Sequence, residues 1–176
     1  MISEGRILLR PLEEGDLERT RGWVNDPEVA RLVNRVLPVT ATEHREWYRR
    51  VLADERQVIF AVEILAEGTH IGNCGLKGID PRVRKAELWM YLGDKSAWGK
   101  GYGTEACRAL CRYGFDRLNL HRIHLYTPIY NGKAVALYEK IGFVREGLLR
   151  QDVFQDGQHL DAVLMGLLRH EFRLAQ

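Results

Sequence analysis

Three glycines fall within five positions, at Gly99, Gly101 and Gly103, between a β-rich segment and an amphipathic stretch. A strand that runs through such a turn into a helix leaves several backbone N–H groups unpaired at the positive end of the helix dipole. Glycine lets the backbone approach an anion without an intervening Cβ, and Lys100 adds a mobile positive charge. The turn therefore predicts a phosphate-binding loop, and the alternative is a tight strand-to-helix connection without a ligand.

Two common phosphate loops fit this turn poorly. The Walker pattern needs Gly-Lys-Ser/Thr at its end, whereas Gly103 is followed by Thr104 and Glu105. The dinucleotide fingerprint survives only as a variant that begins at Gly101 and ends at Ala106. The preceding strand also follows two hairpin-like strands instead of opening a β-α-β unit. A nucleoside triphosphate and a nicotinamide redox domain are thus disfavoured.

The spacing of apolar residues predicts the order of the secondary structure. Strands are expected at 6–10, 58–65, 70–76, 86–92 and 123–126, with two more around the turn at 156–157. Helices are expected at 13–24, from 42 onward, after the glycines, and at 134–141. The order β-α-α-β-β-β-α-β-α-β-β predicts a mixed α/β fold, with a mostly antiparallel sheet flanked by helices.

Two of these helices have a predicted buried face. Trp47, Val51 and Leu52 are expected to share one face of the second helix. In the helix after the glycines, the apolar face is predicted to hold Cys107, Leu110, Cys111, Gly114 and Leu118.

Composition bounds the remaining possibilities. The 176 residues, 45% of them hydrophobic, predict one domain spanning 1–176. With 26 basic and 24 acidic residues, no general attraction to nucleic acid or to a membrane is expected. Because no signal sequence or membrane-spanning run is visible, a cytoplasmic protein is expected. Cys74, Cys107 and Cys111 are interpreted as reduced core thiols, and no cysteine or histidine spacing suggests a metal site.

Two segments, 98–106 and 131–143, carry a family resemblance. The first reads WGKGYGTEA and the second NGKAVALYEKIGF. Together they resemble the GNAT superfamily of acyl-CoA-dependent N-acetyltransferases, in the branch of ribosomal-protein N-terminal and spermidine acetyltransferases. The resemblance covers nearly the whole chain. It implies transfer of an acetyl group from acetyl-CoA to an amine, no metal or redox cofactor, and a homodimer as the expected assembly.

The resemblance also implies where coenzyme A binds. Gly101 and Gly103 occupy the two glycine positions of the family loop Gln/Arg-x-x-Gly-x-Gly/Ala, and Trp98 stands in place of Gln or Arg. The diphosphate is expected on the amides of residues 99–104, and the pantetheine arm on the backbone of the preceding strand. The implied cofactor-binding residues are Met90, Tyr91, Leu92, Trp98, Gly99, Lys100, Gly101, Tyr102, Gly103, Thr104 and Asn131.

Two residues are candidates for proton transfer. Tyr138 lies seven positions, two helical turns, after the predicted cap Asn131, and it matches the family's general acid, which protonates the leaving thiolate. Glu87 corresponds to a catalytic glutamate of some family members and shares a sheet face with Trp89 and Tyr91. The alternative for Tyr138 is a packed core residue. The alternatives for Glu87 are a structural carboxylate paired with an arginine, or proton removal by ordered water.

The acceptor remains open at this level. In this fold it enters between the first two helices and the last hairpin, where the candidates are Trp23, Asn25, Trp47, Tyr48, Asp152, Phe154 and Asp161. These residues do not separate protein N-termini from polyamines, amino sugars or antibiotics, and packing alone would also explain them. A noncatalytic acyl-CoA sensor is the alternative to an enzyme.

Overall fold

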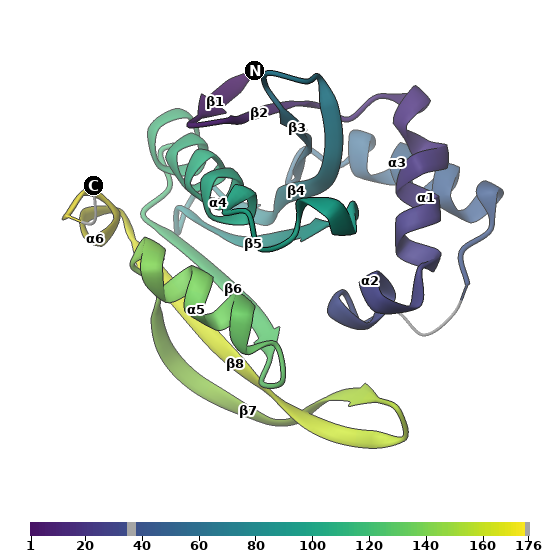
Figure 1. Cartoon of the computed structure of the whole chain (residues 1–176). Coiled ribbons are helices and arrows are strands. Elements are labelled where there is room, and N and C mark those ends of the chain that lie inside the picture. The colour runs from purple at the N-terminus through teal and green to yellow at the C-terminus, as the bar shows by residue number, and fades with distance from the viewer. Residues whose placement is uncertain (35–37, 175–176) are drawn as a thin grey trace.

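A computed structural model describes residues 1–34 and 38–174. Its strands form one sheet with the order β1-β2-β3-β4-β5-β6-β8-β7 (Figure 1). The strands are β1 (Ile2–Glu4), β2 (Ile7–Pro11), β3 (Val58–Ile64), β4 (Thr69–Asp80), β5 (Lys85–Leu92), β6 (Arg122–Pro128), β7 (Val144–Gln155) and β8 (Gln158–Leu168). The α-helices are α1 (Leu17–Asn25), α2 (Pro27–Leu32), α3 (Ala41–Ala53), α4 (Tyr102–Arg112), α5 (Gly132–Ile141) and α6 (Arg169–Leu174). The predicted mixed fold with a mostly antiparallel sheet is confirmed.

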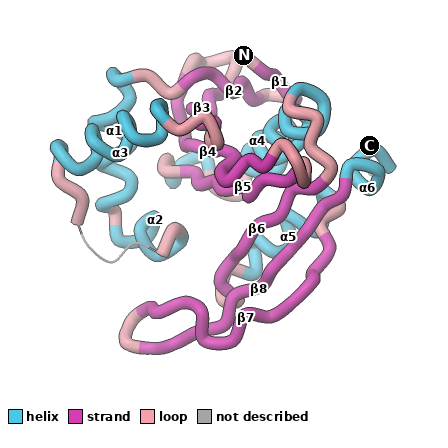
Figure 2. The backbone as a smooth tube through the Cα atoms, turned by 180° about the vertical axis from the view of Figure 1, so that it is seen from behind, coloured by secondary structure: helices cyan, strands magenta, loops and turns pink. Residues whose placement is uncertain are grey.

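The pairing of β5 with β6 interrupts the antiparallel order. These two strands are parallel, and their ladder covers only Lys85–Glu87 against Arg122–His124. Beyond Glu87 the strands separate, since β5 continues along β4 while β6 continues along β8. Figure 2 shows β6, β8 and β7 running away from the rest of the sheet. The sheet therefore opens into a V at the carboxyl end of β5.

Alternation along β5 divides the molecule into two sides. Leu88, Met90 and Leu92 belong to the main core, which includes Cys107 and Leu110 of α4. On the other side, Trp89 packs against a smaller cluster that contains Tyr48 and Val51 of α3. Figures 1 and 2 place α4 and α5 over one face of the sheet and show α1 to α3 as a separate group. Each side chain of β5 thus faces one of two different environments.

Local signals explain where the helices begin and end. Asp26 caps α2 by accepting from the amides of Glu28 and Val29, and Pro27 occupies the first helical position. Thr40 and Glu43 form a capping box at α3. Asn131 caps α5 by accepting from the Ala134 amide, and Gly142 ends that helix in the left-handed conformation.

The structure adds to and corrects the predicted elements. Strand β1, helix α2 and helix α6 were not in the predicted order, and the first helix begins with a 3₁₀ turn at Glu14–Asp16. The assignment of Leu52 to a buried face was wrong, because this side chain is 60% exposed. The buried residues of α3 are instead His44, Tyr48 and Val51. Hydrogen bonds from Tyr48 to the Leu12 carbonyl and between His44 and Thr20 set this rotation of the helix.

Candidate acetyl-CoA and acceptor site

The glycine-rich loop presents a row of backbone donors at the start of α4. Gly99 and Gly101 have φ angles of +75° and +88°, and Gly101 is the N-cap of the helix. Within the described structure, the N–H groups of residues 99–103 have no hydrogen-bond acceptor, whereas the Thr104 amide donates to the Gly101 carbonyl at 3.0 Å. Five unpaired amides at a helix N-terminus suit an anion. Of the amides at 99–104 that were predicted to bind the diphosphate, the Thr104 amide therefore already has a partner within the helix.

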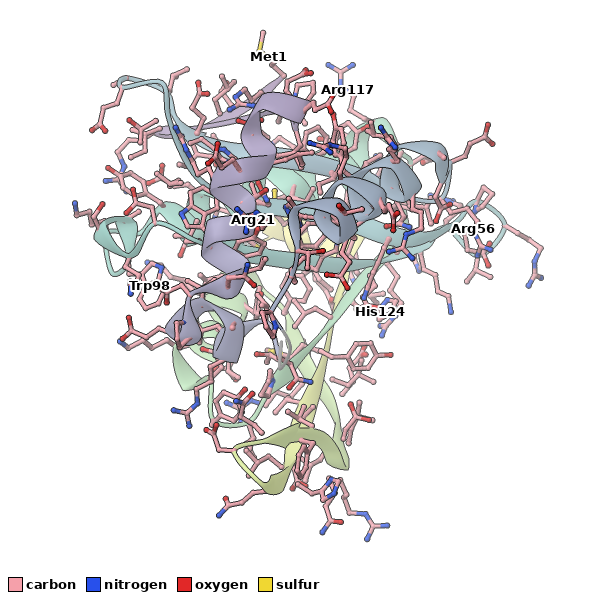
Figure 3. All side chains as sticks on the ribbon, turned by 90° about the vertical axis from the view of Figure 1, so that its right-hand side faces the viewer. Met1, Arg21, Arg56, Trp98, Arg117 and His124 are labelled. Atoms are coloured by element: carbon pink, nitrogen blue, oxygen red, sulfur yellow. The ribbon has the colours of Figure 1, made fainter. Side chains whose placement is uncertain are left out.

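The loop is attached to the carboxyl end of β5. The indole Nε1 of Trp98 donates to the Leu92 carbonyl at 2.9 Å. Leu92 lies in the part of β5 that has separated from β6, so this bond anchors the loop at the open side of the V. Figure 3 shows the labelled Trp98 and His124 on opposite sides of the view, and His124 pairs with Glu87 near the other end of β5. The indole N–H of Trp98 is thus used in a hydrogen bond to the protein's own backbone.

Gly103 allows three elements to meet next to the loop. A Cβ at this position would lie 3.1 Å from Leu137 Cδ1 of α5 and 3.7 Å from Met90 Cε of β5. A side chain here would push α4 away from both neighbours. The third glycine therefore serves close packing, while the first two serve the backbone conformation.

Tyr138 lies on the buried face of α5 and is 8% exposed. Its ring packs edge-on against Phe143, with 5.6 Å between the centroids. Burial raises the pKa of Tyr138 above its usual value, with smaller contributions from Cys107 and Cys111 of α4. The phenol is protonated at neutral pH, and its burial makes it a weaker acid than an exposed tyrosine.

Comparison with known proteins identifies the family. A family model described as "Acetyltransferase (GNAT) domain" matches residues 6–144. The chain belongs to the GNAT acetyltransferases. It is an acetyl-CoA-dependent N-acetyltransferase, which confirms the predicted family, activity and co-substrate and sets the redox alternative aside.

Relatives cover almost the entire chain. The spermidine N(1)-acetyltransferase of Escherichia coli K12 is 31% identical over 98% of this chain and 91% of its own. The putative ribosomal N-acetyltransferase YdaF of Bacillus subtilis is 33% identical over 94% and 93%. The spermidine N-acetyltransferase of Vibrio cholerae, solved with CoA and spermine, has a TM-score of 0.90 at 31% identity and covers 96% of this chain and 98% of that one.

On the opposite side of β5, Glu87 has charged and aromatic neighbours. Its Oε1 lies 2.9 Å from Lys77 Nζ of β4, so Glu87 forms an ion pair, but with a lysine and not with the arginine that the alternative named. Glu87 is in register with His124, the last paired position before the V opens. The predicted aromatic face is present, since Trp89 and Tyr91 stack with 6.5 Å between their ring centroids.

A chain of polar side chains leads from the 3₁₀ turn before α1 to Tyr91. Asp16 Oδ1 lies 3.2 Å from His70 Nδ1, His70 Nε2 lies 2.9 Å from Asn73 Oδ1, and Asn73 Nδ2 donates to the Tyr91 hydroxyl at 2.9 Å. His70 is 2% exposed and Asn73 is fully buried. Burial lowers the pKa of His70, and Asn73 and the Asp16 carboxylate offset part of this effect. Sequence reasoning missed this chain, although a polar Asn73 inside an apolar strand was a signal.

The candidate acceptor residues lie in different settings. Asn25 and Tyr48 use their polar atoms on the protein backbone, at Val39 and Leu12 respectively. Trp23 instead packs edge-on against His70 and Tyr91, with centroid distances of 4.8 Å and 6.4 Å. Asp152 and Phe154 are exposed on β7, and Asp161 accepts from the Gln151 amide. Trp23 is therefore the candidate most closely tied to β5.

Two further observations concern cofactors and membranes. Among residues 1–34 and 38–174, no group of three or more His, Cys, Asp or Glu side chains is arranged to hold a metal ion. In that same part of the chain, no helix combines the length and apolar character needed to cross a bilayer.

Proposed function

We propose that acetyl-CoA binds in the V between β5 and β6 and that a primary amine attacks it directly in a ternary complex. The row of unpaired amides at 99–103, beside the part of β5 that leaves β6, carries this proposal. Acetyl-CoA supplies the acetyl group as a thioester. The amides and Lys100 hold the diphosphate, Met90 to Leu92 hold the pantetheine arm through their backbone, and Trp98 and Asn131 support the two ends of the site.

Tyr138 is proposed as the general acid. Amine attack on a thioester expels a thiolate, which is more stable once protonated. The phenol of Tyr138 is protonated at neutral pH, as any phenol is, and the burial that raises its pKa also raises the pKa of a thiol released beside it. Its position between α4 and α5 supports this role, since both helices border the proposed cofactor site.

Glu87 is proposed to remove the amine proton, with ordered water as the alternative. Glu87→Gln is expected to lower kcat/KM by about tenfold to a hundredfold, most steeply at lower pH. The control is Lys77→Met, which removes the ion partner and leaves the carboxylate in place. An unchanged pH profile for Glu87→Gln would assign proton removal to water.

The acceptor is proposed to be a primary amine, either a polyamine-like small molecule, an amino sugar or a protein N-terminus. The relatives named for spermidine and for a ribosomal substrate motivate the first and last classes. Consumption of acetyl-CoA should be measured with spermidine, an aminoglycoside and ribosomal N-terminal peptides. Turnover with one class identifies the acceptor. CoA binding without turnover of any of these amines would place the acceptor outside the three classes.

The assembly is proposed to be at least a homodimer. One solved structure of the Vibrio cholerae spermidine N-acetyltransferase is described as dodecameric. In this chain, Val144, Leu148 and Phe154 of β7 are each about half exposed, as is Tyr126 of β6. Light scattering of the purified protein tests the proposal, and a monomer at all concentrations would refute it. A cytoplasmic location and the absence of nucleic-acid or membrane partners stay expectations.

A further inference from the structure

The turn between β1 and β2 contacts the phosphate-binding loop through Arg6. Its Nη2 donates to the Lys100 carbonyl at 2.8 Å, and its Nε donates to Glu105 Oε1 at 2.9 Å. The Arg6 backbone amide donates to Glu105 Oε2 at 2.6 Å. The guanidinium also lies 4.4 Å from the centroid of the Tyr102 ring. The side chain of Arg6 thus contacts Lys100, Tyr102 and Glu105, in the loop and the first turn of α4.

The bond to the Lys100 carbonyl acts on the peptide between Lys100 and Gly101. In a planar trans peptide, the carbonyl of one residue and the N–H of the next point in opposite directions. The bond from Arg6 therefore directs the Gly101 N–H away from Arg6. A flip of this peptide changes φ of Gly101, and glycine, here at φ +88°, adopts either sign of φ without a Cβ clash. Without Arg6, the carbonyl can turn to the side where the amides now point.

Arg6 also compensates a carboxylate close to the loop. Glu105 lies in the first turn of α4, where its negative charge would oppose a bound diphosphate. Burial raises the pKa of Glu105, but hydrogen bonds from Arg6 and its charge outweigh this effect and the pKa lies below its usual value. Glu105 is therefore ionised, and Arg6 supplies the opposite charge.

We propose that Arg6 is a positioning residue for acetyl-CoA, which locks the Lys100–Gly101 peptide with its N–H towards the diphosphate and neutralises Glu105. This inference rests on the proposed placement of the diphosphate at residues 99–103. Arg6 acts through the loop and does not itself touch the co-substrate.

A second ion pair offers a matched control. Arg112 Nη2 lies 2.9 Å from Glu4 Oε2, so this pair also joins the β1–β2 region to α4. It lies at the last residue of α4, at the opposite end from the glycine loop. Arg112→Gln removes an arginine that joins the same elements and leaves the loop untouched.

The test compares CoA, dephospho-CoA and acetyl-pantetheine on the full chain. Calorimetry should show that Arg6→Gln raises the Kd for CoA and the Kd for dephospho-CoA alike. The increase should be about tenfold or more, as loss of a charge-assisted hydrogen bond implies. Turnover of acetyl-pantetheine, which lacks the diphosphate, should change by less than about twofold, as should the KM for the amine. Arg112→Gln should alter none of these values. The double variant Arg6→Gln/Glu105→Gln, which removes both charges, should recover only part of the lost affinity.

The outcomes separate this inference from the proposed site. If the wild-type protein does not bind CoA, the proposed cofactor site is wrong. If it binds CoA and Arg6→Gln binds equally well, the role of Arg6 is wrong. The inference would be overturned if Arg6→Gln lowered turnover of acetyl-pantetheine as much as it lowers CoA binding. It would also be overturned if Arg112→Gln lowered CoA binding as much as Arg6→Gln does, because Arg6 would then be only a structural contact. Full recovery in the double variant would overturn the peptide lock.

Discussion

The two sides of β5 are built in different ways. On the α4 and α5 side, the proposed cofactor site consists mainly of backbone, with glycines, a helix start and an unpaired strand edge. On the α1 to α3 side, the acceptor candidate Trp23 packs on the side chain of Tyr91, which stacks on Trp89 and accepts a hydrogen bond from Asn73. A backbone site can serve one constant co-substrate, whereas a side-chain site can be altered residue by residue.

This difference predicts where substitutions act. Changes on the cofactor side should alter acetyl-CoA binding or the chemical step. Changes on the acceptor side should alter the KM for the amine and the stability, because the polar chain is part of the interior. The following substitutions test this division.

Tyr138→Phe should have the largest effect. Loss of the proton donor should lower kcat by about a hundredfold, while the Kd for CoA stays the same, because the ring that packs on Phe143 is retained. Steady-state kinetics and calorimetry measure both values. The control is Tyr113→Phe, which removes a hydroxyl from a ring that packs on Phe60 beside the same core. A fall in kcat of less than about threefold for Tyr138→Phe would argue against a general acid there.

Gly93→Ala should have the second-largest effect, and this effect should fall on the acceptor side. A Cβ at Gly93 would lie 2.0 Å from the Trp23 ring, so the indole must move. We expect the KM for the amine to rise by about tenfold and the free energy of unfolding to fall by about 2 kcal/mol. Gly22→Ala is the control in α1, since within the described structure no atom lies within 4 Å of its added Cβ. A change confined to the KM for acetyl-CoA would contradict the division into two sides.

Asp16→Asn should lower the free energy of unfolding by an amount that depends on pH. Burial raises the pKa of Asp16, but hydrogen bonds from Arg10 and the Glu13 amide and the nearby charges outweigh it, so the pKa falls from 3.8 to about 2. A lowered folded-state pKa stabilises the protein above pH 3.8, and this stabilisation is lost as pH falls towards 2. At pH 7 the variant should lose about 1 kcal/mol, after allowance for solvent screening.

Urea unfolding at pH 7, 4 and 2.5 measures this prediction. The difference between wild type and Asp16→Asn should shrink as the pH falls. The control is Asp156→Asn, whose partner Arg31 lies 3.5 Å away with both side chains exposed, and which should cost less than about 0.5 kcal/mol. If the difference in free energy of unfolding between wild type and Asp16→Asn did not depend on pH, the charge of the Asp16 carboxylate would not be what stabilises the protein.

Cys111→Ala should have the smallest effect on turnover. Cys111 is fully buried, and burial raises the pKa of its thiol, so it is protonated and unreactive at neutral pH. Direct attack by the amine needs no acyl-cysteine, and kcat should change by less than about threefold. Loss of turnover, together with an acetylated enzyme detected by mass spectrometry in the wild type, would contradict direct attack.

Much of the cofactor side was predictable because its signals are local. The positive φ angles at Gly99 and Gly101, the cap at Asn131 and the buried face around Cys107 all depend on neighbouring residues. Helix α2 was predictable in principle, since Asp26 and Pro27 form a cap and a first helical position. The helix expected at 13–24 stopped before these residues, and this six-residue element was not expected. The roles of Glu87 and Tyr138 in catalysis stay predictions.

The acceptor side was less predictable because distant residues create it. Leu52 was placed in the core by helical spacing alone, whereas the bonds of Tyr48 and His44 rotate α3 so that Leu52 faces outward. The ion pair of Glu87 follows from the register of β4 against β5, which places Lys77 directly opposite.

The sequence by itself determined the glycine-rich turn before α4, the family resemblance and the order of most elements, because each depends on φ preferences, caps and periodicity within a few residues. Only the tertiary structure decided which side chains meet. Arg6 and Glu105 are 99 residues apart, and Asp16, His70 and Tyr91 come from α1's preceding turn, β4 and β5. Such contacts depend on strand register and helix rotation, which the packing of the whole chain sets.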